Sequence, residues 1–220
     1  MTKPSVYFFD AAGTLLHPAR PVGETYAAIA RAHGAELDPA RLQEGFRAAF
    51  RKLGPRAAGT VPENGDDRAW WRQVVRLSVE GQPAPAAFEP WFEELYTHFS
   101  QPEVWRLFPD VAPTLEALQG SGARLAVLSN WDARLRPVLE GLGLGRFFER
   151  LFISAEMGCA KPDPLIFRKA LAAMDCAPEE AAMVGDEAAH DDVPARAQGL
   201  RAYLLDRPRR GLEGLLESLD

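Results

Sequence analysis

Cysteine and lysine are scarce in this sequence of 220 residues. Its two cysteines, Cys159 and Cys176, are too few for the disulfide framework that stabilises small secreted domains, so the fold must depend on a hydrophobic core. Arginine carries most of the positive charge, and a lysine at a special position is therefore more noticeable than usual. The lysines are Lys3, Lys52, Lys161 and Lys169.

The sequence also lacks an excess of positive charge and any long apolar run. Its formal net charge of −6 gives no overall attraction to a polyanion, so nucleic-acid binding is not expected. No stretch approaches the roughly 18 apolar residues that a membrane-spanning helix needs. The N-terminal segment reaches Asp10 before an apolar secretory segment could form. We therefore expect a cytoplasmic protein that neither binds nucleic acid nor enters a membrane.

The composition is that of an ordinary globular protein. Apolar residues make up 47% of the sequence and charged residues 25%, which argues against intrinsic disorder and against a fibrous repeat. A chain of this length can form one large domain, or a core domain that carries a smaller insert.

Short apolar runs of strand length occur near the N-terminus and, from Pro109 onward, in alternation with helical patterns. The expected strands are Val6–Phe9, Leu125–Leu128, Leu151–Ile153, Ala182–Val184 and Ala202–Leu205. The expected helices are Val111–Gln119, Arg134–Gly141, Leu165–Met174 and Val193–Gln198. Asp110 is a possible cap of the first of these helices. The alternation predicts right-handed βαβ crossovers, and hence an α/β fold with a Rossmann-like parallel sheet.

The segment between the first strand and Pro109 has a different pattern. It contains amphipathic stretches, enough for about four helices, and no convincing strand. We expect residues 17–108 to form a helical cap domain, inserted into a Rossmann-like core of residues 1–16 and 109–220. Residues 54–67 are rich in glycine, proline and polar residues and are the best candidate for a mobile loop. The hinges are expected near residues 17–21 and 108–110.

Polar side chains follow the predicted strands at the points where the strands end. Asp10 follows the first strand, Ser129 follows the second, and Asp186 follows the fourth with Asp191 close behind. Lys161 follows the third strand after a short loop. In an open parallel sheet, ligands bind beyond the carboxyl ends of the strands. We therefore expect these side chains to form one site.

These segments resemble the four motifs of the haloacid dehalogenase superfamily of hydrolases, in order and in spacing. The matching segments are Phe9-Asp10-x-x-Gly13-Thr14-Leu15, Ser129-Asn130, Lys161-Pro162 and Gly185-Asp186-x4-Asp191. One motif alone would be a weak signal, whereas all four at strand ends are a specific combination. The cap segment is similar to the subfamily of haloacid dehalogenase-like hydrolase domain-containing protein 3. This similarity lies in Val22-Gly23-Glu24-Thr25-Tyr26, Trp70-Trp71 and Leu95-Tyr96-x-His98-Phe99-Ser100.

The resemblance implies a Mg²⁺-dependent phosphatase in which Asp10 is the nucleophile. Asp10 would attack phosphorus and form an aspartyl-phosphate that water then hydrolyses. A phosphate dianion and a carboxylate repel each other, so a cation must bridge them, and Mg²⁺ prefers hard oxygen ligands. By resemblance the protein ligands are Asp10, the backbone carbonyl of Ala12, Asp186 and Asp191, the last directly or through water. The neighbouring Asp192 is more simply interpreted as a helix N-cap.

The resemblance also implies roles for the remaining polar residues. Lys161 would place a positive charge against Asp10 and the transferring phosphoryl oxygens. Asp10 and Lys161 are thus the expected catalytic residues, and Thr14, Ser129 and Asn130 are expected to bind the substrate. Each of these last three, taken alone, would be an ordinary turn residue. The expected partner is a small phosphorylated molecule; the sequence identifies neither that molecule nor the oligomeric state.

One position departs from the phosphatase pattern. Ala12 stands where phosphatases of this family carry a second aspartate, which protonates the leaving oxygen and later activates water. Loss of such a group costs about 10²- to 10⁴-fold in rate. The loss is greatest for alkoxide leaving groups and smallest for groups that leave readily as anions. His17 and Glu24 are candidates to replace the missing acid, although both would ordinarily be surface residues.

The missing aspartate leaves three alternatives open. Family members that cleave carbon–halogen bonds also lack it, but they do not keep the acidic pair that Asp186 and Asp191 represent here. Members that cleave carbon–phosphorus bonds have alanine at this position, keep Mg²⁺ and use a cap lysine. Lys52 is the only lysine of the cap segment and is more simply a solvated helix residue. The third alternative is a protein that binds phosphorylated ligands without turnover; a retained Asp10 argues against it.

Overall fold

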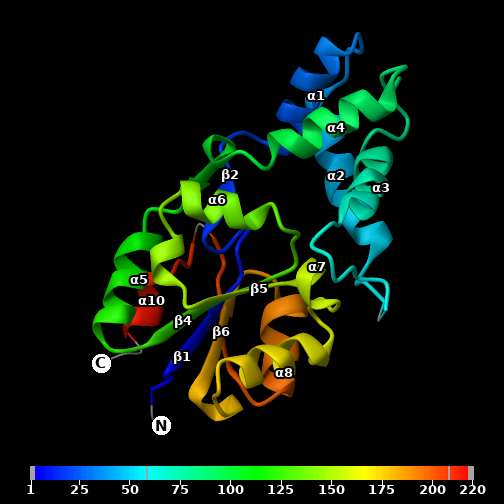
Figure 1. Ribbon diagram of the computed structural model, residues 1–220. Helices are drawn as coiled ribbons and strands as arrows, with labels where there is room; N and C mark the ends of the chain where they lie inside the picture. Colours follow the sequence, from blue (N-terminus) through cyan, green and yellow to red (C-terminus); the bar gives the residue numbers. More distant parts are fainter. Residues whose placement is uncertain (1–2, 58, 208, 218–220) are drawn as a thin grey trace. The chain divides into compact units, whose positions relative to one another are not determined.

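A computed structural model describes residues 3–57, 59–207 and 209–217, and it shows an α/β fold built on a parallel sheet (Figure 1). The sheet has five strands in the order β5-β4-β1-β6-β7. They are β1 (Val6–Phe9), β4 (Arg124–Ser129), β5 (Arg150–Ile153), β6 (Ala181–Gly185) and β7 (Arg201–Leu204). All pairings between them are parallel. The predicted Rossmann-like parallel sheet is confirmed, with strand ends shifted by at most one residue.

Strand β1 forms the centre of the sheet and of the core. Its four residues, the β-branched and aromatic sequence Val-Tyr-Phe-Phe, are completely buried because helices cover both faces of the sheet. Phe9 pairs with Val127 of β4 on one side and with Val184 of β6 on the other. The three central strands therefore end at the same edge.

Helices lie between the strands and after the last one, and they bury their apolar sides against the sheet. They are α5 (Val111–Gly120), α6 (Leu135–Gly141), α7 (Ser154–Met157), α8 (Pro164–Ala173), α9 (Val193–Ala197) and α10 (Glu213–Glu217). Helix α8 shows how the sequence specifies them. Its first residue is Pro164, the preceding Asp163 carboxylate accepts a hydrogen bond from the Leu165 amide at 2.8 Å, and Ile166 and Phe167 are completely buried.

The two aspartates predicted as helix caps stand at the expected positions but do not cap. Asp192 precedes α9, and its carboxylate accepts from Nε of Arg196 at 3.0 Å instead of from the helix backbone. Asp110 precedes α5 and binds Arg207. Both aspartates have helical backbone angles, whereas a capping residue ordinarily has an extended backbone that directs its side chain at the first free amides.

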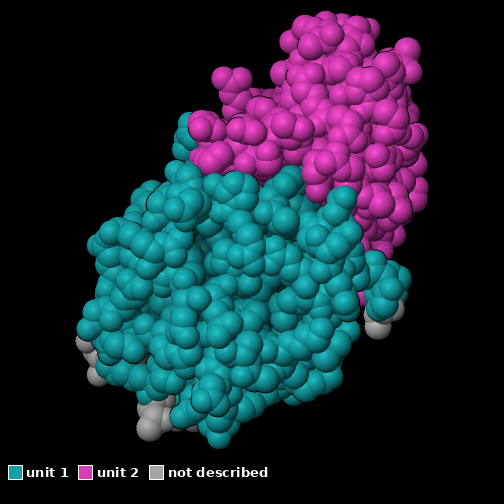
Figure 2. Space-filling model, viewed as in Figure 1, with its two compact units in different colours: residues 1–17, 57–66, 106–220 teal, residues 18–56, 67–105 magenta. Residues whose placement is uncertain are grey.

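The chain divides into two compact units (Figure 2). Unit 1 comprises residues 1–17, 57–66 and 106–220 and contains the parallel sheet; unit 2 comprises residues 18–56 and 67–105. The helices of unit 2 are α1 (Val22–Ala32), α2 (Pro39–Leu53), α3 (Arg68–Ser78) and α4 (Phe88–His98). Strands β2 (Leu16–Pro18) and β3 (Trp105–Leu107) pair in a separate two-stranded sheet.

Unit 2 has a core of its own, in which aromatic residues dominate. Trp91, Phe92 and Leu95 of α4 are at most 1% exposed and pack with Tyr26 and Leu42 from the first two helices. The spacing of the first three on one helical face is the pattern from which the helical insert was predicted. Among the described residues, no helix has the length and apolar character required to cross a membrane.

The loop at residues 57–66 belongs to the sheet unit, although its sequence neighbours on both sides belong to unit 2. Gly65, which has a φ of 78°, donates from its amide to the carbonyl of Ala155 at 2.8 Å. The Gly65 carbonyl accepts from the amide of Ala133 at 2.9 Å. Backbone bonds therefore attach Gly65, near one end of the segment for which mobility was predicted, to two other segments of unit 1.

Candidate active site at the carboxyl edge of the sheet

The candidate site lies at the carboxyl ends of β4, β1 and β6, the central strands of the sheet. Asp10 directly follows β1, and its amide donates to the carbonyl of Val184 in β6 at 2.9 Å, which continues the ladder beyond the strand. Ser129 is the last residue of β4, and Asp186 directly follows β6. Parallel pairing thus brings side chains from distant parts of the sequence to one edge.

Lys161 supplies the positive charge of this site and is only 2% exposed. Its Nζ lies 2.7 Å from Oδ1 of Asp10 and 2.5 Å from Oδ1 of Asp191. Its backbone is held by Asn130, whose Nδ2 donates to the Lys161 carbonyl and whose Oδ1 accepts from the Lys161 amide, both at 2.8 Å. The ammonium therefore approaches both carboxylates from a fixed direction.

The two carboxylates keep Lys161 charged. Burial opposes the charged form, but the charges of Asp10 and Asp191 and their hydrogen bonds outweigh it and raise the pKa of Lys161 above its ordinary value. Lys161 is consequently a cation at neutral pH and a poor proton donor. A lysine that keeps its proton is suited to stabilising negative charge on a substrate. It is not suited to protonating a leaving group.

The remaining carboxylates are crowded. Burial, reinforced by the negative charges of Asp10 and Asp191, raises the pKa of Asp186 to about 6. The Thr14 hydroxyl donates to Oδ1 of Asp186 at 3.1 Å and acts in the opposite direction. Burial also raises the pKa of Asp191, against the opposing charge of Lys161. A second cation beside Lys161 would relieve this repulsion.

The donor set fits a hard divalent cation. One oxygen from each of Asp10, Asp186 and Asp191 lies within 4.8 Å of the other two. Carboxylate oxygens are the ligands that Mg²⁺ and Ca²⁺ prefer. Ala12, whose backbone carbonyl was predicted as a further ligand, lies in the turn that follows Asp10 and has an exposed side chain.

Two glycines make room for the acidic cluster. Gly13 has a φ of 82°, and a Cβ at this position would lie 2.2 Å from Oδ2 of Asp186. A Cβ at Gly185 would lie 2.2 Å from Cγ of Asp191, whose Oδ2 accepts from the Glu187 amide at 3.1 Å. The close approach of a carboxylate thus requires a glycine at both positions, and the positive φ favours one at Gly13 as well.

The family model for haloacid dehalogenase-like hydrolases matches residues 4–199. The chain belongs to this family. It is 38% identical to human haloacid dehalogenase-like hydrolase domain-containing protein 3 over 204 residues, which cover 91% of this chain and 81% of that protein. It is 42% identical to the phosphoserine phosphatase of Thermus thermophilus over 113 residues, which cover 51% of this chain and 45% of that protein. The crystal structure of a HAD phosphatase from Thermococcus onnurineus superposes with a TM-score of 0.67 at 25% identity, covering 98% of this chain and 97% of that one.

The site of this haloacid dehalogenase-like hydrolase brings together most of the residues predicted from its sequence. Lys161 contacts both Asp10 and Asp191, and Thr14 contacts Asp186. Ser129 is buried at the end of β4. The roles of these residues in binding and catalysis stay predictions.

Asn130 has a structural task that its motif did not reveal. Its side-chain nitrogen and oxygen are both bonded to the backbone of Lys161, 31 residues further along the chain. This geometry makes Asn130 a positioning residue for the lysine, and its contact with substrate stays a prediction. The sequence shows the motifs that contain Asn130 and Lys161, but not the hydrogen bonds between them.

The residues considered as a Schiff-base lysine or as a replacement for the missing acid are Lys52, His17 and Glu24. The ammonium of Lys52, on α2 of unit 2, lies 3.3 Å from Glu80, and both side chains are more than 60% exposed. This is the setting of a surface ion pair, and it offers no support for a Schiff-base lysine. The ring of His17 packs on Phe108 with centroids 4.7 Å apart, and Glu24 is exposed on α1.

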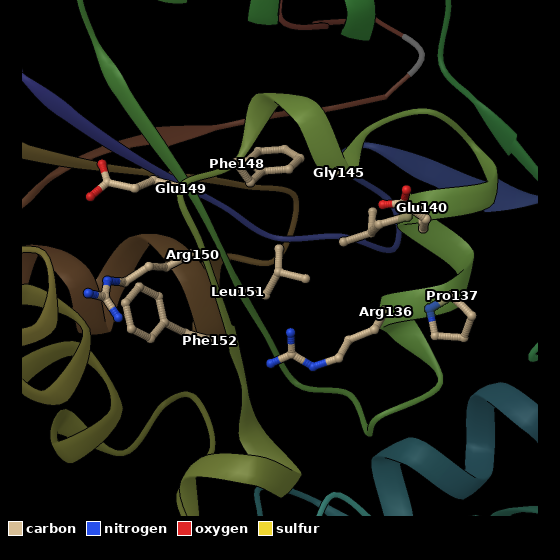
Figure 3. Close-up of a pocket in the computed structure, with 10 residues that line it drawn as sticks. Arg136, Pro137, Glu140, Gly145, Phe148, Glu149, Arg150, Leu151 and Phe152 are labelled. Carbon is tan, nitrogen blue, oxygen red and sulfur yellow. The ribbon is translucent and has the colours of Figure 1, made fainter.

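A separate hollow of about 700 Å³ lies between α6 and the outer strand β5. Figure 3 shows Arg136 of α6 and Leu151 of β5 among the side chains that line it. Its lining combines apolar side chains with Glu140, Glu149 and Arg150, and it includes no residue of the predicted site. The hollow is therefore separate from the predicted site.

Proposed function

We propose that this hydrolase is a Mg²⁺-dependent phosphatase of small phosphorylated molecules and that it acts through an aspartyl-phosphate on Asp10. The observation that carries the proposal is the buried ammonium of Lys161, held between Asp10 and Asp191 with Asp186 beside them. The relatives support it, because one is described as a phosphoserine phosphatase and another as a HAD phosphatase.

In the proposed reaction, a carboxylate oxygen of Asp10 attacks phosphorus while the bond to the leaving oxygen breaks, and the electron pair departs with that oxygen. Lys161 stabilises the negative charge on the phosphoryl oxygens. Ser129 and Thr14 are assigned as hydrogen-bond donors to the same oxygens, for which the Thr14 hydroxyl must release Asp186. Water then attacks the phosphorus of the aspartyl-phosphate. The bond between phosphorus and the Asp10 oxygen breaks, a proton of the water passes to solvent, and phosphate and the Asp10 carboxylate are released.

Mg²⁺ would be held by Asp10, Asp186, Asp191 and the backbone carbonyl of Ala12. When bound, it supplies the positive charge that lets a phosphate dianion approach the Asp10 carboxylate. The residues themselves orient the nucleophile, since Asp10 is fixed by its backbone bond to Val184 and by Lys161.

Chelation of divalent cations is expected to abolish turnover. Hydrolysis of an aryl phosphate by protein dialysed against EDTA should fall by about 10²-fold or more, because a bound metal ion contributes several kcal/mol of charge stabilisation. Added Mg²⁺ should restore the rate, while the same ionic strength of Na⁺ should not. An undiminished rate in EDTA would overturn the metal-dependent mechanism.

The leaving group limits which phosphorylated molecules are good substrates. The methyl group of Ala12 cannot donate a proton, and Lys161 holds its own proton because both of its carboxylate partners stabilise the charge. Substrates whose leaving group departs as a stable anion, such as aryl and acyl phosphates, are therefore turned over faster than alkyl phosphates. Unit 2 is assigned as the cap that closes over the substrate and excludes water.

A further inference from the structure

Asp110 is a buried carboxylate at the start of α5 that does not bond to its own helix. Its side chain is 8% exposed. Both of its oxygens accept from Nη1 of Arg207, at 2.8 and 2.9 Å, and Oδ2 also accepts from the Leu212 amide at 2.5 Å. The carboxylate is thus committed to the segment that follows β7, 97 residues further along the chain.

Arg207 connects this carboxylate to the turn that follows the proposed nucleophile. Its side chain is 12% exposed, its guanidinium lies over the ring of Phe108 at 4.0 Å, and Nη2 donates to the backbone carbonyl of Thr14 at 2.8 Å. The packing around the pair is tight, because a Cβ on Gly211 would lie 2.4 Å from Oδ2 of Asp110. The planar guanidinium bonds to the two acceptors through two different nitrogens in a fixed geometry, which the single nitrogen of a lysine does not reproduce.

The turn held by Arg207 carries one group proposed to meet the cation, the Ala12 carbonyl, and the hydrogen-bond partner of another, Asp186. The Thr14 hydroxyl donates to Asp186, and the carbonyl of Ala12 lies in the same turn. Displacing the Thr14 carbonyl would therefore move both the partner of Asp186 and the backbone near Ala12. Groups that orient metal ligands from outside typically change metal affinity by about 10- to 100-fold when they are removed.

We propose that Arg207, fixed by Asp110, is a positioning residue that sets the affinity of the acidic cluster for its divalent cation through Thr14 and Asp186. It touches neither the cation nor the substrate. The inference rests on the proposed function only in taking Mg²⁺ as the cation.

Calorimetric titration of Mg²⁺ into the metal-free protein tests this inference without turnover. Arg207→Met is expected to weaken Mg²⁺ binding by about tenfold or more. In an activity assay, the Mg²⁺ concentration for half-maximal rate should rise by the same factor, while kcat at saturating Mg²⁺ returns toward the wild-type value. A purely structural role would instead lower the unfolding temperature and leave the Mg²⁺ affinity unchanged, which would overturn the inference.

Arg124→Met is the matched control. Arg124, at the opposite end of β4 from Ser129, donates to both oxygens of Glu149 and to the carbonyl of Met174 at 2.6 Å, and so repeats the bonding pattern of Arg207 away from the site. The Arg124–Glu149 pair is more exposed than the Arg207–Asp110 pair, so the two substitutions should differ in their effect on stability. The titrations are therefore run well below the unfolding temperature of each variant. Mg²⁺ affinity in Arg124→Met should equal that of the wild type, and an equal loss in both variants would overturn the inference.

Arg207→Lys covers the case in which Arg207→Met does not fold. It keeps a charge beside Asp110 but replaces the two nitrogens that bond to Asp110 and Thr14 with a single one in a different geometry, so its Mg²⁺ affinity should lie below the wild-type value. An affinity equal to wild type would overturn the inference. Failure of the proposed function gives a different result, because it appears as a lack of phosphate-ester turnover by the wild-type protein, whereas this inference is measured from the Mg²⁺ affinities of the variants.

Discussion

Asp10→Asn is expected to lower kcat for an aryl phosphate by on the order of 10⁴-fold or more, because removing the nucleophile of a covalent mechanism removes the whole pathway. Asparagine has nearly the same shape, so the backbone bond to Val184 should persist. The loss would therefore report chemistry and not misfolding. Steady-state rates measure the loss of activity, and circular dichroism shows whether the variant is folded.

Asp192→Asn is the control for this substitution. Asp192 adjoins Asp191 in sequence, but its carboxylate contacts Arg196 on the surface of α9. The same chemical change there should leave kcat within a small factor of the wild type. Asp10→Ala excludes activity that arises from deamidation of the new asparagine. Substantial turnover in both Asp10 variants would refute the assignment of Asp10 as nucleophile.

Ala12→Asp is expected to raise the hydrolysis of alkyl phosphates by about 10²-fold or more. The new carboxylic acid would follow Asp10 in the same turn, where it could protonate an alkoxide and then activate water. The Ala12 side chain is exposed, so the substitution should cost little stability. Aryl phosphates should gain less, because their leaving group needs no proton.

Ala12→Asn separates proton transfer from added polarity. It introduces a side chain of the same size that can donate a hydrogen bond but cannot act as an acid or a base. Only Ala12→Asp should accelerate the hydrolysis of alkyl phosphates. Equal acceleration by both variants, or no acceleration by Ala12→Asp, would show that a missing acid is not what limits the rate.

The parts of the fold that were predictable are those that local pattern specifies. Apolar runs such as Val6–Phe9 are long enough to indicate strands, and parallel strands deliver whatever follows them to a common edge. This is why Asp10, Ser129 and Asp186 could be placed at one site before any coordinates were known. The amphipathic spacing in unit 2 likewise indicated helices with an aromatic core.

The parts that were not predictable depend on contacts between distant segments. Asp110 has the sequence position of a helix cap, and only its bonds to Arg207 show that the side chain is used elsewhere. The hydrogen bonds between the Asn130 side chain and the Lys161 backbone likewise cannot be predicted from the sequence. Residues 54–67 have the composition of a mobile loop, but composition does not show the backbone bonds that Gly65 makes to the sheet unit.

Chemical trapping of the intermediate tests the central claim most directly. Wild-type protein turning over an aryl phosphate in Mg²⁺ is quenched in acid, reduced with borohydride, digested and analysed by mass spectrometry.

The intact quenched protein should carry one phosphoryl group. Since no base at Ala12 activates water, this form should accumulate, with a burst of released phenol before steady state. Borohydride should convert Asp10 to homoserine. Turnover without a phosphorylated protein, or with the modification on a residue other than Asp10, would contradict the account.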